Sequence, residues 1–265
     1  MIFVADNINP MNPVAAQAVA SDCGDEVRAL AGQCAAAGAV WIDVNPGYLS
    51  ERRRGRMETL VHAVCAGAPD VRLVLDSPVP EVLERGLRAC AGTSAAAPVL
   101  SALTMEPAKL QGILPLAVDN AGTDLVCLLL DERSLCPVSA EEKMALALAL
   151  RSEAQAAGVD PARLIFDPVL PNLSWPDAKA HLDAAVQCVQ TIASGDLFGE
   201  PARTMAGISN LLSGGLRRTH AALLEYDAAR RLAAAGLYAA SVKISKGCFA
   251  CFIIMQSSSF FKRVP

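Results

Sequence analysis

The sequence predicts an α/β protein with a single (β/α)8 barrel, the TIM-barrel architecture. Short apolar runs alternate with longer segments of helical period about eight times along 265 residues, which is the length and rhythm of such a barrel. The chain is 53% apolar, enough to fill a sizeable core. An open doubly wound sheet is the main alternative. No glycine-rich GxGxxG turn follows the first apolar run, as a dinucleotide-binding sheet of that kind would require.

Eight apolar runs of strand length are the expected strands. The first is MIFVAD and the last, the least distinct, is LYAASVKI. The expected strands cover residues 1–6, 39–45, 71–77, 97–103, 123–131, 163–169, 204–210 and 237–244.

Seven segments between these runs have apolar residues at helical spacing, and several end on a glycine that suits a left-handed C-terminal cap. The expected helices cover residues 25–38, 56–67, 80–92, 106–122, 139–158, 176–194 and 218–236. No linker or low-complexity tract interrupts this pattern, so we expect one barrel domain over residues 1–240.

The last 25 residues differ in character from the rest. Residues 241–265 contain four basic side chains, no acidic one and four of the seven phenylalanines. Their apolar residues are clustered instead of periodic, so they fit poorly as the eighth amphipathic helix. We expect an irregular or degraded segment that completes or flanks the barrel in place of the last helix.

Composition and charge narrow the class of partner. A net charge of -4 provides no basic field for nucleic acid or for an anionic membrane, which leaves a small molecule or another protein. The nine cysteines are odd in number and lie mostly within apolar patterns, as reduced core residues do. The sequence shows neither a secretory signal pattern nor an apolar stretch long enough to span a membrane. We therefore expect a cytoplasmic protein.

Small polar side chains follow nearly every expected strand, where a (β/α) barrel gathers its chemistry. Lysine and arginine are missing from this set. The residues are Asp6, Asn7 and Asn9 at the first strand, Asp43 and Asn45 at the second, Asp76 at the third, Ser101 in the fourth, Asp167 at the sixth, and Ser209 and Asn210 at the seventh.

Several chemistries lack the residues they need at these positions. The three histidines, His62, His181 and His220, fall in expected helices, so neither a histidine metal site nor a Ser-His-Asp triad is expected at the strand ends. The segment SGGLRR at 213–218 is a weak phosphate-loop candidate. The pair Cys248 and Cys251 is a weak redox or metal candidate because no second pair accompanies it. We expect no bound metal.

Carboxylates and amides without a metal suit a neutral heterocycle with adjacent N–H donors. A pterin has an exocyclic amine beside a ring N–H, and one carboxylate can accept both hydrogen bonds. Asp76 and Asp167 are of the right type for this task. Capping of the helices that follow is the other role open to such residues.

Six motifs in order resemble the pterin-binding methyltransferases that move a methyl group from methyltetrahydrofolate to a corrinoid protein, within the dihydropteroate synthase-like superfamily. They span roughly residues 1 to 240. The motifs are ADNIN (5–9), WIDVNPG (41–47), LVLDS (73–77), ILPLAV (113–118), LIFDPVLP (164–171) and AGISN (206–210). The resemblance implies a (β/α) barrel that is usually a homodimer and binds the pterin in its mouth.

The resemblance also implies roles for single residues. Asp76 and Asp167 bind the pterin ring, together with Ser101 at a position that is usually asparagine in the family. Asn210 corresponds to the asparagine proposed to hydrogen-bond N5 of the folate, and it is the catalytic candidate. The remaining members of the candidate pterin-binding set are Asn9, Asp43, Asn45 and Ser209.

Two departures from the family pattern bear on activity. The family usually has a Glu-Arg pair in its first loop, where this chain has Asp6 and Asn7, and the pattern fades after Gly236. A folate-binding barrel with weakened catalysis is therefore one alternative.

Dihydropteroate synthase is a less favoured alternative. Its Asn-x-Thr-Pro-Asp-Ser-Phe and Ser-Arg-Lys segments are replaced by INPMNPV and GISNLLSGG. The chain also has no Asp-x-His-x-x-Gly motif, so the resemblance places the cobalamin on a separate corrinoid protein.

Overall fold

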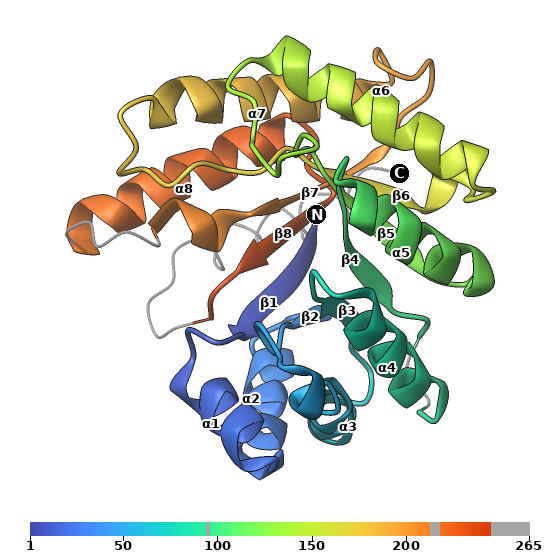
Figure 1. Ribbon diagram of the computed structural model, residues 1–265. Helices are drawn as coiled ribbons and strands as arrows, with labels where there is room; N and C mark the ends of the chain where they lie inside the picture. Colours follow the sequence, from blue (N-terminus) through green and yellow to red (C-terminus); the bar gives the residue numbers. More distant parts are fainter. Residues whose placement is uncertain (94–95, 213–217, 245–265) are drawn as a thin grey trace, which may run out of the picture.

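Eight parallel strands close into a barrel in the order in which they occur along the chain (Figure 1). The structure is a computed structural model that describes residues 1–93, 96–212 and 218–244. The predicted fold class is confirmed. The strands are β1 (Ile2–Ile8), β2 (Trp41–Val44), β3 (Arg72–Asp76), β4 (Val99–Leu103), β5 (Asp124–Leu128), β6 (Leu164–Asp167), β7 (Arg203–Gly207) and β8 (Ala239–Val242).

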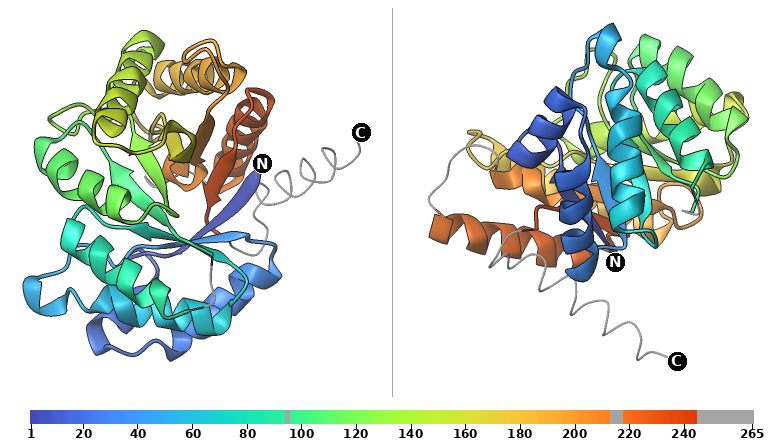
Figure 2. Two further views of the ribbon diagram at one scale, coloured as in Figure 1. Left: turned by 90° about the vertical axis from the view of Figure 1, so that its right-hand side faces the viewer. Right: turned by 90° about the horizontal axis from the view of Figure 1, so that it is seen from below.

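Helices surround the sheet on all sides, as Figure 2 shows from two further directions. They are α1 (Pro13–Ser21), α2 (Asp25–Ala36), α3 (Arg56–Gly67), α4 (Pro80–Ala91), α5 (Pro107–Asp119), α6 (Ala140–Ala156), α7 (Ala178–Ser194) and α8 (Arg218–Ala234). Local sequence sets their ends. Ser139 caps α6 by accepting a hydrogen bond from the Glu142 backbone N–H, and Gly195 ends α7 in the left-handed conformation. None of the described helices is long and apolar enough to cross a membrane.

Two local features differ from the sequence prediction. Helix α1 was not expected, although Asn12 caps it and Pro13 occupies its first turn; its alanine-rich sequence has little amphipathic contrast to reveal it. The seventh apolar run leaves the sheet after Gly207 and forms the 3-10 helix η3 (Ile208–Leu212).

The expected C-terminal segment is described only in part. Its first residues, 241–242, complete β8, which pairs with β1 and closes the barrel. The candidate Cys248 and Cys251 pair and most of the SGGLRR segment lie outside the described residues.

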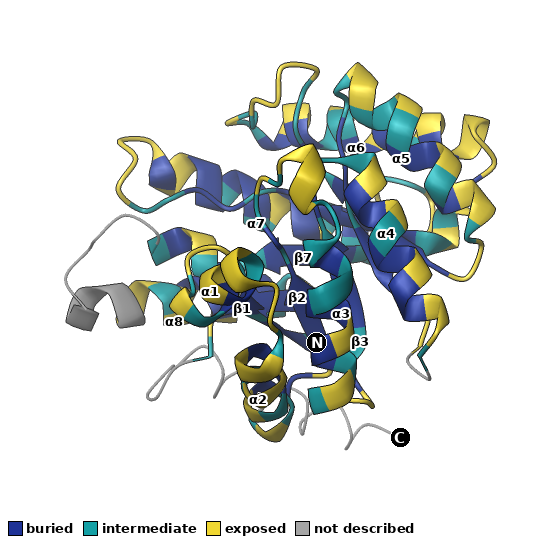
Figure 3. Ribbon diagram, turned by 60° about the horizontal axis from the view of Figure 1, so that its bottom comes forward, coloured by how far each residue is buried: buried dark blue, intermediate teal, exposed yellow. Residues whose placement is uncertain are grey.

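The barrel interior is filled by side chains in layers, because alternate residues of each strand point inward. The middle layer is apolar. It contains Val4, Trp41, Val74, Val99, Val126, Ile165, Met205 and Ala239, and Ala102 of β4 packs in the same cluster. A second, larger cluster packs between the strands and the helices, and Figure 3 shows the buried sheet inside helices that are exposed on their outer faces.

The layer toward the amino ends of the strands is ionic. The Asp124 carboxylate accepts hydrogen bonds from Arg72 and from both terminal nitrogens of Arg203, at 2.5 to 2.9 Å. Burial alone would raise the pKa of Asp124, but the hydrogen bonds from the two arginines outweigh it and hold this pKa below its ordinary value. This network closes the end of the barrel opposite to the polar strand ends.

Candidate functional site

The residues two positions beyond the apolar layer form the third interior layer, at the carboxyl ends of the strands. The two-residue period of a strand dictates this placement, since Val4 is followed at the same face by Asp6, and Val74 by Asp76. The layer is acidic. Its members are Asp6, Asp43, Asp76, Ser101, Leu128, Asp167, Gly207 and Ser241. Five predicted polar positions, from β1, β2, β3, β4 and β6, therefore meet in one layer.

Asp76 is held by two neighbouring side chains. The Asn45 amide nitrogen donates to Asp76 Oδ2 at 2.7 Å, and Ser101, its register partner on β4, donates a second hydrogen bond. Asn45 is fixed in turn because its oxygen accepts the Gly47 backbone N–H at 2.8 Å. Helix α4 begins at Pro80 without any side-chain cap, so Asp76 does not have the capping role left open by the sequence.

Asp6 links β1 to the 3-10 helix η3 that follows β7. The Ser209 hydroxyl donates to Asp6 Oδ2 at 2.6 Å, and the Asn9 amide donates to Asp6 Oδ1 at 2.7 Å. Asn9 also accepts the Met11 backbone N–H, so its amide mainly organises the loop after β1. Asp6 was expected among the strand-end polar residues but not in the candidate pterin-binding set, whereas its carboxylate is a central member of the layer.

Asn7 lies on the opposite face of β1 from Asp6. Its side chain is buried and exchanges two hydrogen bonds with the backbone of Ile244, at 2.9 and 2.8 Å. Strand alternation explains this, because neighbouring residues of a strand point to opposite faces. Asn7 therefore ties the chain after β8 to β1, and the sequence analysis, which grouped it with the strand-end residues, missed this contact.

Burial dominates the electrostatics of three carboxyls in this layer. It raises the pKa of Asp76 to about 6 and the pKa of Asp167 to about 7, and it raises the pKa of Asp43 well above its ordinary value. Mutual repulsion adds to the effect, since Asp76 raises the pKa of both Asp43 and Asp167. Within the described residues, Asp43 Oδ1 is buried without a hydrogen-bond partner. Such carboxyls are suited to accept N–H donors from a ligand that offsets the cost of their burial.

Asp167→Asn stabilises the protein more at about pH 8 than at about pH 5. The folded-state pKa of Asp167 is about 7 against an ordinary value of 3.8. The native state therefore retains a proton that the unfolded state loses, and wild-type stability falls as the pH rises toward 7. The variant has no such charge, so its free energy of unfolding relative to wild type is about 2–3 kcal/mol higher at about pH 8 than at about pH 5. Urea unfolding of both proteins at both pH values measures this difference.

The control for this experiment is Asp70→Asn. Asp70 is exposed and precedes β3, at the opposite end of the barrel. If Asp167→Asn and Asp70→Asn changed the free energy of unfolding equally at both pH values, the raised pKa of Asp167 would be contradicted.

Asn210 lies in η3, just after β7, and is exposed. Its amide lies over Gly207, because a Cβ built on Gly207 would be only 2.8 Å from Asn210 Nδ2. Gly207 is the one member of the acidic layer without a side chain, so the Asn210 amide occupies the space above β7. Ser209, the neighbour of Asn210, is anchored to Asp6 and fixes the start of η3.

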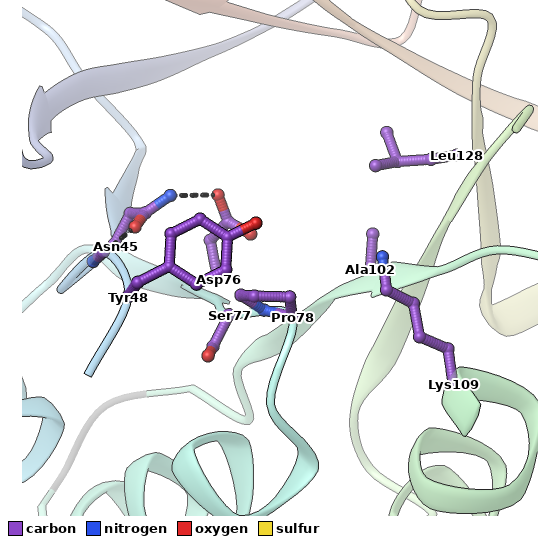
Figure 4. A pocket seen from close by; sticks show the side chains of 9 residues that line it. Asn45, Tyr48, Asp76, Ser77, Pro78, Ala102, Lys109 and Leu128 are labelled. Carbon is purple, nitrogen blue, oxygen red and sulfur yellow. Dashed lines mark hydrogen bonds between the residues drawn. The ribbon is translucent and has the colours of Figure 1, made fainter. Parts of the chain in front are cut away.

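A cavity of about 240 Å³ opens beside Asp76 at the mouth. Figure 4 shows Asn45 and the exposed Tyr48 on one side and Lys109 of α5 with Leu128 of β5 on the other. None of the strand-end residues is basic, but a cation reaches the cavity from a helix: Lys109 lines it from the first turns of α5, and its charge lowers the pKa of Asp76. This volume is slightly below the range of small-molecule sites, which are about 300–1,000 Å³.

A second lysine lies beneath the site. Lys143 of α6 is fully buried, and its charge lowers the pKa of Asp167. The signal was present in the sequence, since Lys143 falls on the same helical stripe as the buried Ala147, Leu150 and Ala154. Across residues 1–93, 96–212 and 218–244, no group of three His, Cys, Asp or Glu side chains is arranged to hold a metal ion.

Comparisons with known proteins agree with this barrel and with the resemblance predicted from the sequence. No family model matches the sequence. The chain is 27% identical over 216 residues to the methylcorrinoid:tetrahydrofolate methyltransferase of Eubacterium limosum, covering 77% of this chain and 78% of the relative.

Solved structures with the same fold include two dihydropteroate synthases. The match to the enzyme from Xanthomonas albilineans in complex with 7,8-dihydropteroate covers 100% of this chain and 94% of the enzyme's chain, with a TM-score of 0.67 and 19% identity. The match to the enzyme from Yersinia pestis in a sulfonamide drug complex covers 98% of this chain and 94% of the enzyme's chain, with a TM-score of 0.68 and 16% identity. The resemblance predicted from the sequence is confirmed by the methyltransferase relative, and the solved structures share the barrel fold.

Proposed function

We propose that this protein is a methyltransferase that moves a methyl group between N5 of tetrahydrofolate and the cobalt of a corrinoid carried by a partner protein. The observation that carries the proposal is the acidic layer at the mouth, in which Asp76 and Asp167 have raised pKa values and few internal partners. The similarity to a methylcorrinoid:tetrahydrofolate methyltransferase supports the same conclusion. The transfer is reversible in principle, so either direction uses the same residues.

In the proposed complex, Asp76 and Asp167 accept the exocyclic amine and ring N–H of the pterin. Both carboxyls belong to the interior layer, so the ring lies flat across the mouth and its donors replace the water that the carboxylates would otherwise need. Asn45 and Ser101 hold Asp76 by hydrogen bonds that also favour its charged form. Ser101 is shorter than the asparagine that is usual in the family. In the proposed complex its hydroxyl hydrogen-bonds Asp76 and does not contact the pterin ring directly.

The chemical difficulty of the reaction is the leaving group. A methyl group departs poorly from a tertiary amine because N5 would acquire negative charge, and a hydrogen bond or proton at N5 offsets that charge in the transition state. The Asn210 amide, positioned above Gly207, is the group we assign to this task. The corrinoid, when bound, supplies the cobalt nucleophile, and the protein supplies position and electrostatics.

A dihydropteroate synthase activity is the second candidate, because the solved structures with this fold include such enzymes. We expect the protein to form methylcobalamin from methyltetrahydrofolate and cob(I)alamin. We expect no dihydropteroate from dihydropterin diphosphate and 4-aminobenzoate, because the Ser-Arg-Lys segment that would hold the diphosphate is absent after β7. Chromatography of the products from the two mixtures separates the candidates, and dihydropteroate alone would overturn the assignment.

The partner and the assembly follow from the same proposal. We expect a corrinoid-binding protein to bring its cobalt to the mouth, as the similarity to a methylcorrinoid:tetrahydrofolate methyltransferase suggests. The homodimer and the cytoplasmic location remain predictions from the sequence.

A further inference from the structure

Lys143 is among the largest fully buried side chains of the described residues, and it is the charged one in that group. Its Nζ donates to the Pro168 carbonyl oxygen at 2.7 Å and lies 2.9 Å from Cys136 Sγ. Within the described part of the chain, no carboxylate lies within ion-pair distance of this ammonium. A lysine is rarely buried so completely without a paired carboxylate, because desolvation of the ammonium is costly. The neighbouring residues, which include the Asp167 turn, indicate a role for this charge.

The hydrogen bond to Pro168 fixes the turn that carries Asp167. Val169, the next residue, has a φ of 56°, a left-handed conformation that β-branched residues rarely adopt. In this conformation its backbone N–H donates to Asp167 Oδ1 at 2.8 Å. Lys143 therefore holds the carbonyl of Pro168, the residue between Asp167 and Val169, and this contact supports a turn that would otherwise be unfavourable.

The charge of Lys143 also acts on Asp167 through space. Four titratable groups lie in this cluster. Lys143 of α6 and Asp76 of β3 act directly on the Asp167 carboxyl, Cys188 of α7 interacts with both Lys143 and Asp167, and Cys136 contacts Lys143. Lys143 lowers the pKa of Asp167, whereas burial and Asp76 raise it. Of these four groups, Lys143 is the only one that favours the carboxylate form of Asp167.

We infer that Lys143 is a positioning residue that clamps the Pro168 carbonyl and keeps Asp167 as a correctly oriented carboxylate for the ligand N–H donors. The inference rests on the proposed function, in which Asp167 binds the pterin ring. It adds a residue on a helix, outside the barrel mouth, to the determinants of pterin affinity.

The test is the affinity for methyltetrahydrofolate, measured by calorimetry across a pH series for wild type and four variants. The affinity of wild type for methyltetrahydrofolate weakens as the pH falls through about 7, because Asp167 gains a proton. Lys143→Met loses both the hydrogen bond to Pro168 and the charge, so its affinity for methyltetrahydrofolate begins to fall about one pH unit higher than that of wild type. Below the wild-type midpoint, the affinity of this variant is about tenfold weaker. Lys143→Gln can still donate to Pro168 but is neutral, so it shows the same shift in midpoint.

Two controls separate this role from stability. Lys143→Arg keeps the charge and restores the wild-type midpoint, whereas Leu150→Ala, a buried truncation on the same helix, lowers stability without moving the midpoint. A wild-type midpoint in folded Lys143→Gln and Lys143→Met would overturn the inference.

A ligand-free measurement distinguishes failure of the inference from failure of the proposed function. The carboxyl carbon of Asp167, assigned by its loss in Asp167→Asn, is followed by NMR during a pH titration of wild type and Lys143→Gln. If wild type binds no folate, the proposed function fails, yet a higher midpoint for Asp167 in Lys143→Gln still supports the role of Lys143. Equal midpoints would refute that role in either case.

Discussion

Replacing Asn210 with alanine lowers the rate of methyl transfer by about 10²–10³-fold and leaves the affinity for methyltetrahydrofolate within about threefold of wild type. The amide contributes most when charge develops at N5, so its loss raises the barrier without weakening ground-state binding. Single-turnover kinetics with cob(I)alamin give the rate, and calorimetry gives the affinity.

Two further variants sharpen this prediction. Gly207→Ala places a methyl group against the Asn210 amide, 2.8 Å from Nδ2 as the structure stands, so it lowers the rate in the same direction. Asn120→Ala removes an amide that donates only to Leu116 at the end of α5, and it leaves both rate and affinity unchanged. Equal losses of rate and affinity in Asn210→Ala would contradict a catalytic role and favour the weakened-catalysis alternative.

Replacing Asp167 with asparagine weakens methyltetrahydrofolate binding by about 10²-fold at about pH 8. The carboxylate accepts two pterin donors, whereas an amide presents one acceptor and one donor, so one favourable contact becomes a repulsive one. The same variant is the one expected to be more stable than wild type at this pH. Affinity and stability thus change in opposite directions, as expected for a buried charge kept for binding.

Calorimetry of Asp167→Asn beside Asp70→Asn checks this result. Asp70→Asn removes an equal charge from the exposed surface at the opposite end of the barrel and retains wild-type affinity. Unchanged folate affinity in Asp167→Asn would show that this carboxyl does not bind the pterin.

Much of the barrel was predictable because each strand has a strong apolar signal of limited length. The two-residue alternation then places Asp76 and Asp167 in one interior layer once the strand ends are known. The same alternation distinguishes Asp6, which points into the layer, from Asn7, which points outward to Ile244. That distinction requires the exact strand register, and the sequence predicted β1 to end at residue 6 when it continues to Ile8.

Other features depend on contacts between distant segments. Lys143 and Asp167 are separated by most of α6 and all of β6, so only packing of the helix against the barrel brings the lysine near the turn. The anchoring of Ser209 to Asp6 spans nearly the whole chain. Helix α1 escaped prediction for a local reason, since its alanines give weak periodicity.

The most direct test of the central claim is the absorption spectrum of cob(I)alamin mixed anaerobically with the purified protein and methyltetrahydrofolate. We expect conversion to methylcobalamin at a rate that depends on Asn210, and the reverse conversion when methylcobalamin is mixed with tetrahydrofolate. Folate binding by calorimetry with no conversion in either direction would contradict the methyltransferase assignment and leave a pterin-binding barrel without this activity.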